Sequence, residues 1–119
     1  MEDYTVVASE VVAGARKLGE VLPGNMAAFS QLGKATYSEG ALSGKMKELI
    51  ALAIGVTVRC DGCLGHHAKA CLTHGATREE VAEAIGVAIH MGGGPSMVYG
   101  ALALEAYDQH AKSAEAKVA

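Results

Sequence analysis

Helix-breaking residues divide this chain into runs of helix-forming residues, and this pattern constrains its fold more than any other feature. Pro23, Gly75 and the segment Gly92-Gly93-Gly94-Pro95 mark the main breaks. Between them Ala, Leu, Glu, Lys and Met dominate, Trp is absent, and aromatic residues make up only 4% of the chain. Because alternating β-branched residues are rare in these runs, we predict an all-α fold.

The residues beside the breaks predict a bundle of about six helices. Proline is tolerated in the first turn of a helix, so Pro23 and Pro95 can each open one. Ser43 can cap a third helix that is apolar nearly all round and should therefore lie buried, and Thr77 begins a capping box. The expected helices cover residues 5–20, 23–37, 44–54, 60–74, 77–91 and 95 onward, with a polar tail from His110.

Length and charge narrow the possible functions. With 119 residues, 50% of them apolar, the chain is predicted to form one domain over residues 1–119. It has 13 acidic and 10 basic residues, and its cations are scattered, so we do not expect nucleic acid as a partner. The first residues are acidic, and no apolar run approaches the roughly 18 residues of a membrane span. We therefore expect a cytoplasmic protein that binds no membrane.

A pair of cysteines stands at the expected start of the fourth helix, with a histidine close behind. Cys60, Cys63 and His67 lie at helical spacing, so their side chains share one stripe of the surface. The free N–H groups and the dipole at a helix N-terminus stabilise a thiolate. An imidazole within reach can accept the thiol proton, and a second cysteine can convert an oxidised sulfur into a disulfide. The pattern indicates a redox-active dithiol.

Glu48 joins this group if the third and fourth helices form an antiparallel hairpin. Glu48 and His67 are then level when the turn is centred between Thr57 and Val58, which is where we expect it. A carboxylate opposite an imidazole fixes its tautomer and increases its basicity. We predict a relay from Glu48 through His67 to Cys63, by direct contact or through a water.

Other kinds of site share parts of this pattern. A structural zinc site also uses CxxC pairs, although only His66, His67 or Cys71 lie near enough in the sequence to add ligands. A haem attachment motif has histidine directly after the second cysteine, where this chain has Leu64, so haem is excluded. The glycine run has no preceding strand and is interpreted as a helix break rather than a phosphate site. We interpret Cys71 as a small buried residue, and His66, His74 and His90 as structural or exposed.

The order of these residues is similar to that of a known family. Glu48, eleven residues, Cys60, two residues, Cys63, three residues and His67 form a pattern that resembles the signature of the alkyl hydroperoxidase D-like branch of the carboxymuconolactone decarboxylase family. The resemblance covers roughly residues 25–107. It implies an alkyl hydroperoxidase D-like all-α fold whose small subunits associate as a homotrimer or homohexamer.

The resemblance also implies a role for each residue. Cys63 corresponds to the peroxide-attacking thiolate and Cys60 to the resolving thiol, with His67 as general base and Glu48 as the residue that orients it. The best-described members have another histidine just before the second cysteine, where this chain has Gly62. The resemblance therefore implies an antioxidant peroxidase or thiol-disulfide oxidoreductase that needs no metal or organic cofactor, acts on a hydroperoxide or disulfide, and is reduced by an external dithiol.

Two alternative functions stay open. A decarboxylase-like lyase would bind a small organic acid in a pocket between the helices and would not need the cysteines, although the decarboxylase branch lacks this dithiol. A non-catalytic redox-sensing or metal-binding module would hold zinc or would oxidise without turnover. Replacement of Cys63 by serine separates the lyase from the redox enzyme, because the lyase would keep its activity.

Overall fold

The chain folds into six α-helices in a computed structural model that describes residues 2–118, and no strand occurs in that range. The predicted all-α class and the six-helix bundle are therefore confirmed. None of the helices in residues 2–118 combines the length and apolar character that a membrane crossing needs. The helices are α1 (Tyr4–Val21), α2 (Pro23–Tyr37), α3 (Gly44–Thr57), α4 (Asp61–Thr73), α5 (Arg78–Gly92) and α6 (Gly94–Val118).

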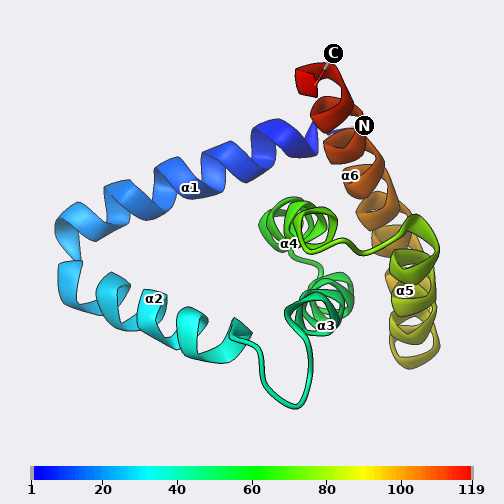
Figure 1. Ribbon diagram of the computed structural model, residues 1–119, viewed down its shortest axis with the longest axis horizontal. Helices are drawn as coiled ribbons and strands as arrows, with labels where there is room; N and C mark the ends of the chain where they lie inside the picture. The colour runs from blue at the N-terminus through cyan, green and yellow to red at the C-terminus, as the bar shows by residue number, and fades with distance from the viewer. Residues whose placement is uncertain (1, 119) are drawn as a thin grey trace.

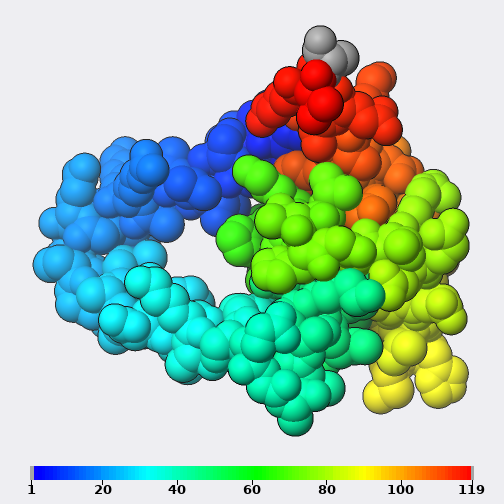
Figure 2. All heavy atoms as spheres, viewed as in Figure 1, coloured from blue at the N-terminus to red at the C-terminus, as the bar shows by residue number. Residues whose placement is uncertain are grey.

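Four helices form the body of the molecule, and the first two form an arm. Figure 1 shows α3, α4, α5 and α6 packed together, while α1 runs outward from this bundle and α2 returns toward α3. The space-filling view shows an opening between this α1–α2 arm, residues 4–37, and the bundle (Figure 2). Most of the core lies within the bundle and includes Leu52, Val56, Leu64, Ala68, Cys71, Val81, Ala103 and Ala106.

The arm buries little of its apolar surface against the bundle. In α1 only Tyr4 and Ala8 are buried, and α2 has no buried residue. The amphipathic pattern predicted for residues 5–20 is present, but Val11 and Leu18 remain 40% and 47% exposed. The single chain therefore leaves much of the apolar side of α1 uncovered.

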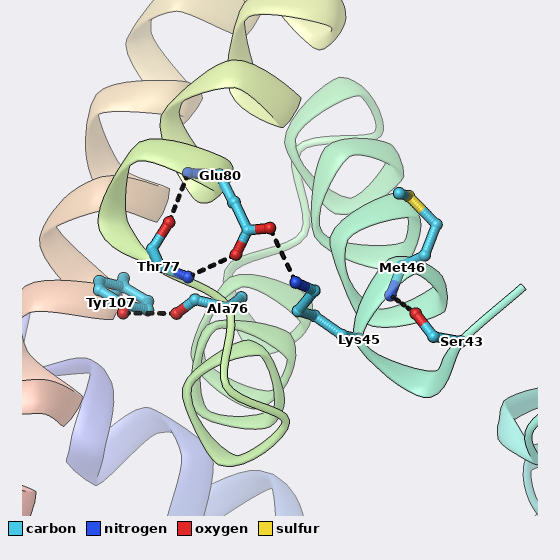
Figure 3. Close-up of polar contacts among 7 residues, drawn as sticks. All are labelled: Ser43, Lys45, Met46, Ala76, Thr77, Glu80 and Tyr107. Atoms are coloured by element: carbon cyan, nitrogen blue, oxygen red, sulfur yellow. Dashed lines mark hydrogen bonds and ion pairs between the residues drawn. The ribbon is translucent and has the colours of Figure 1, made fainter.

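The predicted capping box at the start of α5 is formed, and it also connects two helices. The Thr77 hydroxyl accepts the Glu80 N–H at 3.1 Å, while the Thr77 N–H donates to Glu80 Oε1 at 2.8 Å (Figure 3). Glu80 Oε2 also accepts from Lys45 Nζ at 2.8 Å, which joins α5 to α3. The Tyr107 hydroxyl donates to the Ala76 carbonyl at 2.7 Å and holds the loop between α4 and α5 against α6 (Figure 3).

Two other helix ends agree with the sequence prediction. The Ser43 side chain accepts the Met46 N–H at 3.1 Å at the start of α3. Gly75 follows α4 with a φ of 81°, the left-handed region that a residue with a side chain rarely adopts. Together these ends fix the positions at which α3 begins and α4 stops.

The last helix differs from the expectation in its second half. The residues from His110 were expected to form a polar tail, but α6 continues to Val118 and His110 is only 6% exposed. Its Nε2–H donates to the Gly65 carbonyl of α4 at 2.9 Å. His110 continues the buried stripe of Ala103 and Ala106, so its side chain packs against α4 instead of facing water.

Candidate active site

A tight turn places the dithiol at the start of α4. Residues 58–60 connect α3 to α4, with Arg59 in the left-handed region at φ 58°. The Cys60 N–H donates to the Gly55 carbonyl at 3.1 Å, and the Cys60 sulfur accepts the Cys63 N–H at the same distance. Cys60 is thus the N-cap of α4, and the predicted position of the CxxC at the beginning of the fourth helix is confirmed.

The two cysteines are joined to each other. Cys60 and Cys63 form a disulfide with their Cα atoms 5.1 Å apart, within the normal range for a disulfide. Both residues are partly exposed, so a small molecule or a partner dithiol can approach them. The pair can therefore alternate between dithiol and disulfide at the N-terminus of a helix, where a thiolate is stabilised.

Glu48 and His67 meet across the hairpin as its antiparallel geometry predicts. His67 Nδ1 lies 2.7 Å from Glu48 Oε1, Glu48 is 6% exposed and the His67 side chain 16%. Because a carboxylate accepts hydrogen bonds, Nδ1 is the donor in this contact, which leaves Nε2 as an acceptor whenever the ring is neutral. Cys63 lies one helical turn before His67 on the same side of α4.

Two further rings pack against His67. The ring of His66 meets it edge to face at 4.8 Å between centroids, and the ring of Tyr37 lies at 5.9 Å. Burial raises the pKa of Tyr37 and the charge of Glu48 adds to this effect, while burial and then His67 lower the pKa of His66. Tyr37 was not identified from the sequence; as the last residue of α2 it brings the end of the arm to the site.

The N-terminal end of α1 is fastened to the helix that carries the dithiol. The Tyr4 hydroxyl donates to Asp61 Oδ1 at 3.2 Å, and burial, with the Asp61 charge, raises the pKa of Tyr4 to about 12. Gly65 permits this packing, because a Cβ there would lie 3.2 Å from the Tyr4 carbonyl oxygen and 3.3 Å from the Ala8 nitrogen. The backbone of α1 therefore rests directly on α4.

The position of α1 gives a physical reason for the glycine inside the dithiol motif. A Cβ at Gly62 would lie 3.0 Å from Cγ2 of Val11. A side chain at position 62 thus requires Val11 or α1 to move. The space next to the dithiol in which a larger residue would stand is taken by the arm.

The remaining sequence candidates, apart from His66, lie outside this group. Cys71 is fully buried, as expected, and burial followed by the charge of Glu48 raises its pKa to about 12. His66, His74 and His90 are exposed. In the part of the chain that the structure describes, no cluster of three or more His, Cys, Asp or Glu side chains is arranged to hold a metal ion. His110 was not predicted to be buried. Its position in line with Ala103 and Ala106 on α6 is the sequence signal that could have shown its burial.

The family of the chain follows from a match over most of its length. The model of the Carboxymuconolactone decarboxylase family matches residues 23–106. The chain belongs to this family. The match includes Glu48, Cys60, Cys63 and His67, and the alkyl hydroperoxidase D-like branch that these residues resemble is consistent with the family.

Two curated relatives are similar to this carboxymuconolactone decarboxylase family protein over most of its length. An uncharacterised protein of Cupriavidus necator is 43% identical over 91 residues, which is 76% of this chain and 80% of that protein. Uncharacterised protein 4 in the cox locus of Paracoccus denitrificans is 37% identical over 82 residues, 69% of this chain and 74% of that protein. The names of these relatives state no activity.

Two solved structures share the fold. A carboxymuconolactone decarboxylase family protein of Legionella pneumophila has a TM-score of 0.88 and 39% identity, covering 92% of this chain and 98% of that one. A family member of Thermotoga maritima, for which involvement in the antioxidative response has been suggested, has a TM-score of 0.79 and 29% identity, covering 91% and 95%. The likeness thus extends beyond the four-helix body.

Proposed function

We propose that this protein is a peroxidase or thiol-disulfide oxidoreductase that reduces hydroperoxides through Cys60 and Cys63. The observation that carries the proposal is the joining of these cysteines at a helix N-terminus, one turn before a histidine that a buried Glu48 holds at 2.7 Å. The antioxidative response suggested for the Thermotoga maritima relative agrees with it.

In the proposed mechanism His67 activates the attacking sulfur. With the disulfide reduced, Nε2 of His67 accepts the proton of the Cys63 thiol, directly or through a water. Glu48, bound to the other ring nitrogen, fixes the orientation of the ring and balances the positive charge that the ring acquires. The N-terminal dipole of α4 stabilises the thiolate that forms.

Peroxide reduction then takes two bond exchanges. The Cys63 thiolate attacks the outer oxygen of the hydroperoxide; an S–O bond forms, the O–O bond breaks, and the alkoxide leaves as alcohol with the proton held by His67. The Cys60 thiol attacks the resulting Cys63 sulfenic acid, so that an S–S bond forms, the S–O bond breaks and water leaves. An external dithiol then supplies two electrons and two protons to restore both thiols.

The exposed apolar surface of the arm supports a proposed assembly into a homotrimer or homohexamer. Isolated exposed apolar residues are common, but here they follow one another along a single segment that packs little against its own chain. A second copy that covers them removes this surface from water. The residues of this surface are Val11, Leu18, Val21, Leu22, Phe29 and Leu32.

Thiol counting tests the proposed redox chemistry. One equivalent of cumene hydroperoxide should remove two of the three thiols of the reduced wild type, and an equal amount of the alcohol should form. Cys63→Ser should react at the background rate, and Cys60→Ser should stop at a sulfenic acid on Cys63. Cys71→Ser is the matched control and should still lose two thiols.

Two results would contradict the redox proposal. If neither the thiol count nor the peroxide concentration responds, the dithiol is not a peroxidase centre. The family name also fits a lyase, so Cys63→Ser should be assayed with small organic acids as well. Decarboxylation that persists in this variant would favour the lyase, because that reaction does not need the sulfur.

A further inference from the structure

A cleft lies between α1 and α4, beside the candidate active site. Its volume is about 570 Å³, within the range of small-molecule sites in proteins. Ala8 and Val12 of α1 and Ala70 of α4 contribute apolar surface. Arg16 and Lys69 also line it, so one cation comes from the arm and the other from the dithiol helix.

The lining of this cleft is positively charged, whereas the protein as a whole is negatively charged. The chain has a formal net charge of −3, yet no Asp or Glu is found among the described residues that line the cleft. Within residues 2–118 neither Arg16 nor Lys69 forms an ion pair. A second, apolar groove lies between α3 and α5, and it carries the opposite charge because Glu80 and Glu83 line it. The α1–α4 cleft thus offers two unpaired cations to an anion.

The cleft also adjoins the relay. His66 lines it, and the ring of His66 packs edge to face against His67 at 4.8 Å. Lys69 follows Cys63 by six residues on α4, which corresponds to about 9 Å along a helix axis. A molecule that places its anionic group beside Lys69 can therefore extend along α4, over apolar surface, toward the dithiol.

We propose that the α1–α4 cleft binds the carboxylate of an amphiphilic substrate, so that the enzyme prefers hydroperoxides of carboxylic acids to uncharged hydroperoxides. Arg16 and Lys69 bind the carboxylate, Val12 and its neighbours contact the hydrocarbon, and the hydroperoxide group reaches Cys63. This inference rests on the proposed peroxidase function for the reaction, and on the cleft for the choice of substrate.

A pair of substrates that differ only in charge tests the preference. The hydroperoxide of linoleic acid and that of its methyl ester carry the same reacting group. Wild type should favour the acid in kcat/KM by about 5- to 10-fold, the effect of two partly exposed ion pairs. The ratio should fall close to one in Arg16→Gln/Lys69→Gln. It should stay at the wild-type value in Lys17→Gln/Lys34→Gln, which removes the same charge from side chains that do not line the cleft.

Calorimetric binding of a molecule without a peroxide group gives an independent readout. Octanoate should bind wild type at least about fivefold more tightly than octan-1-ol, and the double variant should lose this difference. Equal turnover of acid and ester, with no preference for octanoate, would overturn the cleft proposal and leave the peroxidase intact. If neither hydroperoxide is reduced, the proposed function fails, and the octanoate preference still decides whether the cleft binds carboxylates.

Discussion

His67 Nδ1 lies 2.7 Å from Oε1 of Glu48, and this contact joins α3 to α4 one turn beyond the dithiol. Both side chains are largely shielded from water. A carboxylate inside a helical bundle is costly unless a hydrogen-bond donor faces it, and here the imidazole is that donor. The contact therefore gives the ring one tautomer and one orientation with respect to Cys63.

The first prediction concerns this contact. Glu48→Gln should slow the reaction of the reduced dithiol with cumene hydroperoxide by about 100-fold, because the ring loses the negative charge that balances its protonated form. Glu48→Asp should recover part of the rate, which a purely structural role of the side chain would not explain. Glu83→Gln, an exposed change on α5, is the control. Equal rates in Glu48→Gln and wild type would remove Glu48 from the mechanism.

The second prediction concerns the third thiol. Since burial raises the pKa of Cys71 to about 12, this residue stays protonated and unreactive at neutral pH. Iodoacetamide at pH 8 should therefore modify Cys60 and Cys63 in the folded, reduced protein, and should reach Cys71 only in denaturant. Mass spectrometry of peptides measures this directly. Rapid modification of Cys71 in the folded state would show that the core opens more readily than its burial indicates.

The fold and the centre of the site were predictable because they depend on local relationships. The caps at Ser43 and Thr77 and the break at Gly75 involve residues close in the sequence. The meeting of Glu48 with His67 follows from a single short turn, which fixes the register of two antiparallel helices. Such relationships leave a periodic signal that a single sequence displays.

Contacts between distant segments were not predictable in the same way. Tyr37 reaches His67 because of the angle at which the arm returns, and no sequence spacing encodes that angle. His110 was assigned to a polar tail because histidine is compatible with both water and a core; its bond to Gly65 joins segments 45 residues apart. The periodicity of residues 5–20 revealed an apolar face but not what covers it.

The third prediction follows from the burial of His110. Burial lowers its pKa from the ordinary value of 6.5, although the bond to Gly65 opposes this in part. At a pH between the lowered pKa of the folded chain and the pKa of about 6.5 in the unfolded chain, the unfolded chain binds more protons than the folded one. The free energy of unfolding therefore has its full value above about pH 6.5 and falls as the pH decreases toward the folded pKa. His110→Gln should weaken this dependence and cost about 1 kcal/mol at pH 8.

Urea unfolding between pH 8 and pH 5.5 measures the effect of His110. His90→Gln, at an exposed position on α5, should keep the wild-type slope of unfolding free energy against pH. Identical slopes in His110→Gln and wild type would mean that His110 titrates alike in the folded and unfolded chains.

The fourth prediction concerns assembly. Light scattering coupled to gel filtration should give the mass of a trimer or a hexamer for wild type. Phe29 is 68% exposed on α2, and Phe29→Asp should shift the protein toward smaller species because it places a charge in the apolar surface of the arm. Ser30→Asp is the control, because it adds the same charge next to Phe29 at a polar position of the same helix. A wild-type monomer would contradict the assembly proposal.

The fifth prediction tests why glycine occupies position 62. A Cβ there would lie 3.0 Å from Val11 Cγ2, so Gly62→Ala should be neutral or should destabilise the fold, although alanine favours helix by up to about 1 kcal/mol. In a Val11→Ala background the clash is absent, and Gly62→Ala should become stabilising. The coupling from a double-mutant cycle should be about 1 kcal/mol, whereas additive effects would show that α1 does not restrict the motif.

The same pair of positions can be tested by measuring the rate of peroxide reduction. If Val11 excludes a side chain beside the dithiol, Gly62→His should disturb α1 and gain nothing, while Gly62→His/Val11→Ala should accommodate the ring next to Cys63. A second imidazole at that position provides another proton acceptor, so peroxide reduction should be faster in the double variant than in Val11→Ala alone. Equal rates in these two proteins would mean that the relay of Glu48 and His67 already supplies all the proton transfer that the reaction requires.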